Sequence, residues 1–239
     1  MLIPQQGFPV REYDAIFVVT PTSKFGHQSD TVMSNIELLV ENNTPEPFDF
    51  PFMVLTTDPG TGANPTSLEP RVLNGSQPMP DLTDASEDEV DEEAIATTMV
   101  AQARAAGITD ETQLTGIGSW VADVLRRAER IQVGRTRIDP NMSRRIILQQ
   151  RLRVLPGEDG RYIFETIAPP PVSTLLTGGR VSVVAVLPWE DEDIHTEVLK
   201  GTGETTLEYD FIEGAMGSRK WVAWHWRNDP LLRLAYRYN

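Results

Sequence analysis

The sequence predicts a mainly β protein, an antiparallel sandwich or a jelly-roll barrel, with a helical insertion at about residues 86–133. About ten short runs of β-branched and aromatic residues are separated by Gly, Pro and Asn turns, as in sandwiches and barrels. Strong helical periodicity occurs only in the middle of the chain. The 239 residues are 40% hydrophobic, enough for a sizeable core. The β framework is therefore assigned to residues 1–80 and 135–239, and an acidic loop plus two helices to residues 81–134.

The first part of the framework contains three predicted strands. Residues 13–20 are a continuous apolar run, which predicts a buried strand, and residues 32–41 and 48–57 predict two more. Residues 58–80 are rich in Gly, Pro, Asn, Ser and Thr. We expect them to form a long excursion without regular structure, of the kind that often serves binding or contacts with a neighbour.

The insertion opens with an acidic run. Residues 81–93 carry eight carboxylates and no cation, and negative charge is favourable at the N-terminus of a helix. Ser86, with Glu89 three residues later, has the spacing of a capping box. A first helix is therefore expected from about residue 87 to residue 106.

A second helix follows in the insertion. Either Thr109 or Asp110 can cap its first turn, and its apolar stripe, which includes Trp120, is expected to pack against the core. The helix is predicted to end near Gly134.

The second part of the framework is again a series of strands. Residues 143–155 combine arginines with apolar residues, and from Gln149 on the two alternate at period two, which predicts a strand with a basic face. The turn at 156–160 and the run 161–167 predict its hairpin partner. Residues 181–187 are the most continuous apolar run and predict a central core strand. Three further short strands are expected at 204–212, 220–227 and 231–238.

One of these strands contains three tryptophans. Alternation places Val222, Trp224 and Trp226 on one face, and Trp221, Ala223 and His225 on the other. Both faces of such a strand need cover. The strand is therefore expected between two layers or at a subunit interface, where Trp and Arg are enriched.

The charge composition indicates an unusual environment. The net charge is −14, and the 21 cations comprise 18 Arg and only 3 Lys. Carboxylate-rich surfaces keep their hydration in concentrated salt, where the Debye length falls to about 3 Å and self-repulsion is screened. A halophilic source is the favoured interpretation, and a GC-rich genome, which also exchanges Lys for Arg, is the alternative. A net anion is also repelled by phosphate, which argues against general nucleic-acid affinity.

The sequence does not predict an enzyme or a cofactor. Its three histidines lie far apart, and no nucleophile elbow, P-loop or dinucleotide fingerprint occurs. There is no cysteine, and no apolar run is long enough to span a membrane. Glu190, Asp191 and Asp193 are weak candidates for a Ca²⁺ or Mg²⁺ site, but a solvated acidic turn is the favoured interpretation.

An arginine cluster follows the acidic run. Nine arginines lie between residues 126 and 153, and we expect them to complement acidic side chains within the chain or across a subunit boundary. Phosphate binding and a merely solvating surface are the alternatives. The candidate interface residues are Arg126, Arg127, Arg144 and Arg145 on the basic side, Asp88, Glu89, Asp91 and Glu92 on the acidic side, and Trp221, Trp224 and Trp226.

These features together resemble the structural proteins of halophilic archaeal virions. Among these, the small single-jelly-roll capsid proteins of tailless icosahedral haloarchaeal viruses are the most similar family, because they combine a β sandwich with an inserted domain. The resemblance rests on composition and strand pattern over the whole chain. It implies a shell subunit that is assembled in the cytoplasm of a halophilic host, contacts its own copies and other virion proteins, and has no membrane span.

Three other functions are consistent with the same features. A tail-tube or distal-tail component of a tailed halophilic virus has the same composition. A carbohydrate-binding or carbohydrate-active protein would use Trp221, Trp224 and Trp226 as a sugar platform. A nucleic-acid-binding protein would use the arginine cluster at 126–153, although that segment lacks interleaved aromatic residues.

Overall fold

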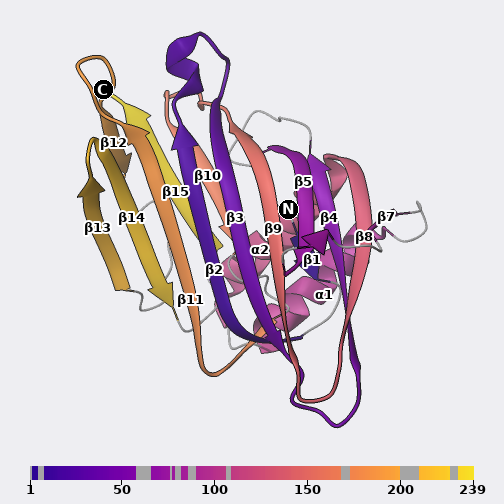
Figure 1. Ribbon diagram of the computed structural model, residues 1–239. Helices are drawn as coiled ribbons and strands as arrows, with labels where there is room; N and C mark the ends of the chain where they lie inside the picture. Colours follow the sequence, from indigo (N-terminus) through magenta and orange to yellow (C-terminus); the bar gives the residue numbers. More distant parts are fainter. Residues whose placement is uncertain are drawn as a thin grey trace.

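The computed structural model contains three β-sheets and two α-helices within the residues that it describes (Figure 1). The helices, α1 (Glu92–Ala105) and α2 (Glu111–Arg126), pack against each other and follow one another in the chain between two strands. The prediction of a mainly β sandwich with a helical insertion is therefore confirmed. The described residues are 2–4, 8–57, 66–75, 77–78, 82–85, 90–105, 109–167, 173–199, 210–226 and 231–239.

The largest sheet has eight strands in the order β13-β14-β11-β2-β3-β9-β5-β6. β2 and β11 run parallel in its middle, whereas the other neighbouring strands are antiparallel. This mixed sheet does not confirm the jelly-roll alternative. The strands are β2 (Phe8–Thr20), β3 (Asp30–Glu41), β5 (Thr66–Asn74), β6 (Gln77–Pro78), β9 (Ser143–Val154), β11 (Ser173–Trp189), β13 (Asp210–Met216) and β14 (Arg219–Trp226).

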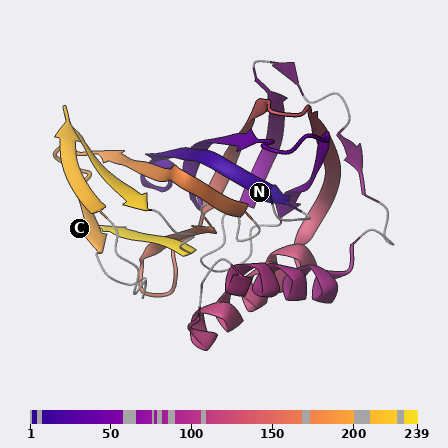
Figure 2. The same cartoon turned by 90° about the horizontal axis from the view of Figure 1, so that it is seen from below.

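Two smaller sheets complete the framework. One has the order β10-β15-β12 and the other the order β1-β4-β8-β7. Figure 2 shows the first of these sheets and the two helices on the same side of the eight-stranded sheet, which therefore has a covered inner face and an outer face. The strands are β1 (Leu2–Pro4), β4 (Phe48–Thr57), β7 (Thr83–Asp84), β8 (Ala128–Ile138), β10 (Tyr162–Ile167), β12 (Thr196–Leu199) and β15 (Leu231–Tyr238).

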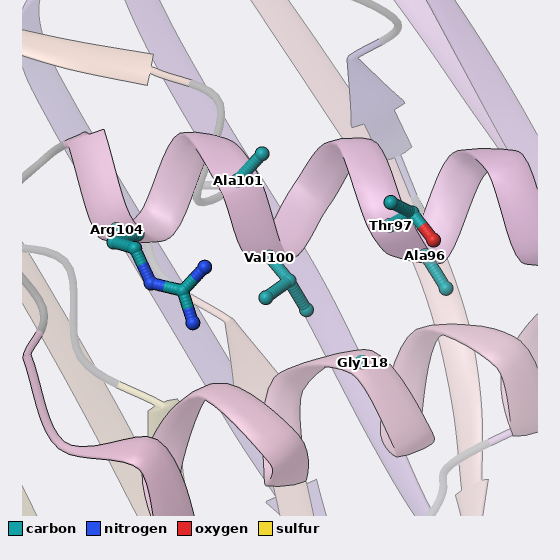
Figure 3. Close-up of a pocket in the computed structure, with 6 residues that line it drawn as sticks. All are labelled: Ala96, Thr97, Val100, Ala101, Arg104 and Gly118. Atoms are coloured by element: carbon teal, nitrogen blue, oxygen red, sulfur yellow. The ribbon is translucent and has the colours of Figure 1, made fainter.

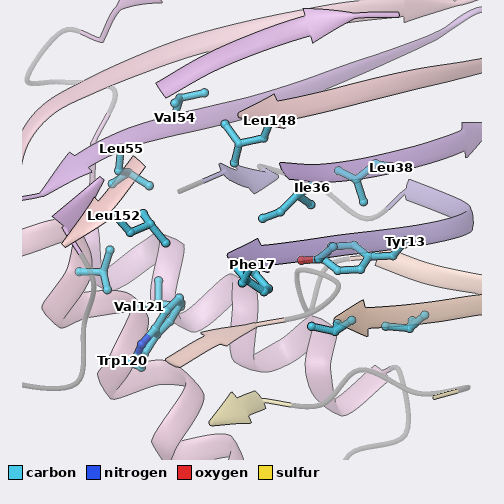
Figure 4. Packing of buried hydrophobic residues seen from close by; sticks show 14 of the residues in the cluster. Tyr13, Phe17, Ile36, Leu38, Val54, Leu55, Trp120, Val121, Leu148 and Leu152 are labelled. Carbon is cyan, nitrogen blue, oxygen red and sulfur yellow. The ribbon is translucent and has the colours of Figure 1, made fainter. Parts of the chain in front are cut away.

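The core lies on the inner face. Every second residue of β3 and of most of β9 is buried, as expected for strands with one covered face. Residues 181–187 behave as predicted, because Val181, Val183, Ala185 and Leu187 are all 0% exposed. Figure 4 shows Trp120 and Val121 of α2 in the same cluster as the sheet residues. Each fully buried Val, Leu or Phe contributes about 1.5–3 kcal/mol, so the helices and the sheets stabilise one another.

The second helix ends earlier than the sequence indicated. α2 ends at Arg126, and the predicted end near Gly134 is wrong because β8 starts at Ala128. β8 pairs with almost all of β4, and this ladder prevails over the local helical pattern. The start of α2 is as predicted, since Asp110 is the N-cap and its Oδ1 accepts a hydrogen bond from the Thr112 amide at 2.9 Å. The predicted capping pair of the first helix, Ser86 and Glu89, lies outside the described residues.

Two further expectations need correction. Residues 66–74 form β5, so this part of the predicted excursion is a strand, with a bulge between Leu68 and Arg71 that accommodates Pro70. The predicted hairpin between residues 143–155 and 161–167 does not form. β9 already pairs with β3 on one edge and β5 on the other, so the chain makes a single bridge after the turn and β10 joins β15 in another sheet.

A buried carboxylate connects the two layers. Asp30, at the start of β3, is 0% exposed, and its Oδ2 accepts hydrogen bonds from the hydroxyls of Tyr236 at 2.9 Å and Tyr238 at 2.6 Å. Its Oδ1 accepts from the Ser23 amide at 3.1 Å and from the Ser23 hydroxyl at 2.5 Å. Tyr162 of β10 stacks on Tyr236 with ring centroids 5.2 Å apart. A charge can remain in the core when it is hydrogen-bonded on both oxygens, as Asp30 is.

This cluster predicts a loss of stability in alkali. Burial, and next the negative charge of Asp30, raise the pKa of Tyr236 well above its usual value, and burial and the Asp30 hydrogen bond raise the pKa of Tyr238. In the unfolded chain both phenols ionise near pH 10. The stabilisation that these two phenols give to the folded state is therefore complete below about pH 10. It decreases as the pH rises further, because there only the unfolded chain releases the phenol protons. Denaturant unfolding in a pH series should show this decline.

Tyr236→Phe tests the origin of the effect. The variant should lose about 1–3 kcal/mol of unfolding free energy at neutral pH, because Asp30 loses a buried donor. Its decline above pH 10 should also be shallower than that of the unmodified protein. An unchanged slope in both Tyr236→Phe and Tyr238→Phe would show that other groups cause the alkaline unfolding.

Candidate interaction surface

The outer face of the eight-stranded sheet carries apolar side chains that no part of the described structure covers. Ile16 is 47% exposed, Met33 51% and Ile212 48%. Soluble proteins rarely expose a contiguous group of large apolar residues unless it is an interaction site. We define the outer patch as these three residues and the half-buried side chains around them, Val18, Val184, Val186 and Trp221.

The strand register brings these residues together. Ile16 of β2 pairs with Val184 of β11, and Ala223 of β14 lies between Val184 and Ile212 of β13. One row along the same face runs Trp221, Val186, Val18 and Met33. Neighbouring strands are about 4.8 Å apart, so the two rows form a continuous surface about 19 Å wide from β13 to β3.

Trp221 depends on a glycine in the next strand. Gly214 of β13 is its register partner, and a Cβ built on Gly214 would lie 2.6 Å from Cε2 of the Trp221 indole. The indole can therefore lie across β13 only because residue 214 has no side chain. The tryptophan thus fills the gap that the glycine leaves in the outer patch.

The three tryptophans of β14 are separated as the alternation predicted. β14 lies between β13 and β11, and Val222 is 1% exposed on the inner face. Trp224 and Trp226 pair in register with Val183 and Val181 of the inner face, although their side chains lie outside the described part of the structure.

Ion pairs lie along one end of the apolar patch. Arg180 lies 3.4 Å from Asp14 and 3.7 Å from Glu12, Arg145 lies 2.6 Å from Glu37, and Arg11 lies 2.8 Å from Glu41. The side-chain hydrogen bond from Arg11 lowers the pKa of Glu41. The acidic side chains that β2 and β3 place on this face are thus all within reach of an arginine. At this end of the patch, four carboxylates are therefore matched by three arginines, although the chain has a net charge of −14.

The predicted arginine cluster is divided between two faces. Arg126 and Arg127 are at the end of α2, on the inner side of the large sheet, whereas Arg145 is on the outer face (Figure 2). Arg126 lies 3.7 Å from Glu92, and Arg127 lies 2.5 Å from Asp123. Both therefore have acidic partners within the chain.

The remaining members of the predicted charged interface differ from one another. Asp91 Oδ1 accepts a hydrogen bond from the Ala94 amide at 2.9 Å and so caps α1. Arg144 has no ion-pair partner among the described residues. Asp88 and Glu89 lie outside the described residues.

A shallow groove of about 280 Å³ lies between the helices (Figure 3). Its walls are mainly the short side chains of Ala96, Val100 and Ala101. Gly118 allows the close approach, since a Cβ there would lie 3.0 Å from Val100. Arg104 at one end is bound to Glu111. The groove offers no set of converging polar groups for catalysis.

The carboxylates of the acidic turn after β11 already accept hydrogen bonds from within the protein. Asp191 Oδ1 accepts hydrogen bonds at 2.8 Å from the amides of Asp193 and Ile194, and Glu190 Oε1 accepts one at 2.7 Å from Lys220. These bonds lower the pKa of both carboxyls, mainly through the Asp193 amide for Asp191 and through Lys220 for Glu190. Within the described residues, no three acidic or histidine side chains are placed to hold a metal ion. The described helices are also too short or too polar to cross a membrane.

The sequence reasoning did not identify Ile16, Met33 or Ile212. Residues 13–20 were predicted to be buried as a whole, but only alternate positions are: Phe17 is 1% exposed and Ile16 47%. A signal was present, because a run that is apolar at consecutive positions presents apolar side chains on both faces of a strand.

Comparison with known proteins provides information about the fold alone. No protein-family model matches the sequence, and the curated proteins give no match. A "putative nutrient binding protein" from Legionella pneumophila is similar in structure, with a TM-score of 0.55 and 10% identity over 99% of this chain and 70% of that protein. An M1 zinc metallopeptidase from Deinococcus radiodurans gives a TM-score of 0.41 and 12% identity, and the chain spans 43% of its length.

The acidic turn gives a testable prediction. Because the pKa of Asp191 is lowered in the folded state, its bonds are complete above the carboxyl's ordinary pKa of about 3.9 and are lost as the pH falls through the lower folded value. Hydrogen exchange of the Asp193 and Ile194 amides, corrected for intrinsic rates, should lose protection in that range. Asp191→Asn is the control, and it should remove this pH dependence. Added Ca²⁺ should leave the protection unchanged; an increase would identify a cation site.

Proposed function

We propose that the protein is a structural subunit that acts by self-assembly, and that the outer patch is a contact between copies. The shell of a virion of a halophilic archaeal virus is the assembly that fits the composition best. The observation that carries the proposal is the patch itself: Ile16, Met33 and Ile212 are exposed together on a face where the acidic side chains of β2 and β3 are already paired.

Charge favours contact between two copies at this face. Two molecules that each carry −14 repel one another, and the repulsion is least where the surface is neutral. The paired arginines and carboxylates at one end of the patch provide such a surface. Because the rim contains both signs, a second copy turned by a twofold rotation can place its arginines opposite carboxylates of the first.

The size of the patch sets the strength of the contact. Interfaces of standard size bury about 800 Å² per partner, whereas two rows across about 19 Å of sheet cover only about 200–300 Å². The patch is therefore the core of a larger contact that includes the ion-paired rim. Such a contact is weak for two isolated molecules and is strengthened when each subunit makes several contacts in a closed shell.

The rival functions receive less support. Trp221 lies on the outer face and is paired with Val186, whereas Trp224 is in register with inner-face Val183, so the three tryptophans do not share one platform for a sugar. Arg126 and Arg127, two arginines of the cluster that a nucleic-acid site would use, have acidic partners, and the cluster is divided between two faces of the molecule. A tail-tube or distal-tail role remains compatible with the same contact surface.

Charge substitutions in the patch test the contact. Ile16→Glu combined with Met33→Glu should weaken self-association at least about 100-fold, since each buried carboxylate costs several kcal/mol without a partner. Met142→Glu is the matched control, because Met142 is 56% exposed in the β8–β9 turn, away from the patch. Sedimentation analysis in molar KCl should show assembly of the unmodified protein and of the control only. A protein that is monomeric at every concentration, or a double variant that assembles normally, contradicts the proposal.

Stability should increase with salt. The many carboxylates that lack a cationic partner repel one another, and ions screen this repulsion. Thermal melts of the monomeric Ile16→Glu, Met33→Glu variant, from low to molar KCl, should show a rising melting temperature. This variant separates the effect on folding from the effect on assembly. A melting temperature that does not depend on salt would leave the high ratio of Arg to Lys as a property of the genome.

A further inference from the structure

A polar pocket of about 520 Å³ opens on the outer face at one end of the β2–β3 hairpin. The segment after β2, which comprises η1 (Thr22–Phe25) and residues 26–29, forms one wall, and β9 forms another. The polar side chains that line it include those of Thr22, His27, Gln28, Thr31, Arg151 and Arg153. None of the described residues that line this pocket is acidic.

The wall formed by the hairpin is held in a fixed shape. Ser23 is bound twice to the buried carboxylate of Asp30, and Gly26 ends η1 in the left-handed conformation at a φ of 87°. Across the loop, Thr22 Oγ1 donates a hydrogen bond of 2.7 Å to the Ser29 carbonyl, and the His27 amide donates to the Thr22 carbonyl at 3.3 Å. This wall of the pocket is therefore preformed, which reduces the entropic cost of binding a ligand.

Two arginines face the pocket without a carboxylate partner. Arg151 and Arg153 are two residues apart on β9, so they point to the same outer face with about 7 Å between their Cα atoms. Arg153 pairs in register with Thr31, which brings a hydroxyl beside it. Among the described residues neither arginine forms an ion pair, whereas Arg11, Arg145 and Arg180 of the same face all do.

Arginines without an ion pair are unexpected on the surface of a chain in which acidic side chains outnumber cations. The chain has 35 acidic side chains and 21 cations, so most cations on its surface have an acidic partner near at hand. Two guanidinium groups, beside a histidine and a glutamine amide, form a set that recognises an anion, whereas the hydroxyls of Thr22 and Thr31 are hydrogen-bonded within the hairpin. The same set contains no carboxylate that would hold a metal ion.

We propose that this pocket binds an oxyanion of the phosphate type. Each planar guanidinium can donate two parallel hydrogen bonds to a phosphate, and these charge-assisted bonds are among the strongest in proteins. The volume exceeds that of one phosphate group, so the oxyanion can be free or be part of a larger molecule, including a phospholipid headgroup. This binding is independent of the self-assembly proposed above and can occur in a monomer.

The test uses the full chain and inorganic phosphate. Phosphate is titrated by calorimetry against chloride at constant ionic strength, and saturable binding is expected. Arg151→Gln and Arg153→Gln should each weaken it about 10- to 100-fold, the range for losing a hydrogen bond to a charged group. The phosphate affinity of Arg153→Lys should lie between those of the unmodified protein and Arg153→Gln, because lysine keeps the charge but cannot donate two parallel hydrogen bonds. Both arginines are exposed, so the variants should keep the unmodified melting temperature without phosphate.

Arg144→Gln is the matched control, because Arg144 is an exposed arginine at the other end of β9 and is not part of the pocket. It should bind phosphate as the unmodified protein does. An equal loss in this control would show general charge attraction and overturn the proposal. Vesicles with and without an anionic phospholipid separate the two sources of the oxyanion. Binding to anionic vesicles that is lost in Arg151→Gln, without binding of inorganic phosphate, identifies a lipid headgroup. The absence of both overturns the proposal.

Discussion

The carboxylate of Asp30 joins the large sheet to the last strand of the chain, more than 200 positions away, and to the segment that precedes β3. It belongs to β3 in the large sheet, it accepts hydrogen bonds from the last strand of the chain, and it holds the segment that begins at Thr22. Each of these donors offsets part of the cost of burying this charge. The attachment of β15 to the large sheet and the shape of the polar pocket therefore depend on the same group.

The distribution of charge connects the structure to its proposed function. A chain with a net charge of −14 has an outer sheet face on which the carboxylates of β2 and β3 are neutralised by arginines from neighbouring parts of the fold. Apolar residues occupy the centre of that face, and Arg151 and Arg153, which form no ion pair within the described part of the chain, lie toward one end of it. Molar salt screens repulsion between copies and strengthens apolar contact, so the same surface is suited to assembly at high ionic strength.

Much of the local structure was predictable, but the partners of the elements were not. The strand at residues 143–155 and its basic face were evident from alternation, yet its expected hairpin partner joins another sheet because β3 and β5 occupy both of its edges. Residues 128–133 read as helix, but the β4 ladder makes them a strand. In both cases a long-range pairing decides between two structures that the local sequence permits.

The sequence by itself determined the fold class, the helical insertion, the opposite faces of Trp221 and Val222, and the acidic, arginine-rich composition. These features depend on periods of two or 3.6 residues and on residue counts, which need no knowledge of distant contacts. Only the tertiary structure decided that Ile16 is exposed while Phe17 is buried, and that Arg180 meets Asp14 across 166 positions. It also decided that Arg151 and Arg153 form no ion pair with any residue that the structure describes. The reason is that exposure and charge pairing depend on which strands become neighbours, and several strands of similar pattern compete for each place in a sheet.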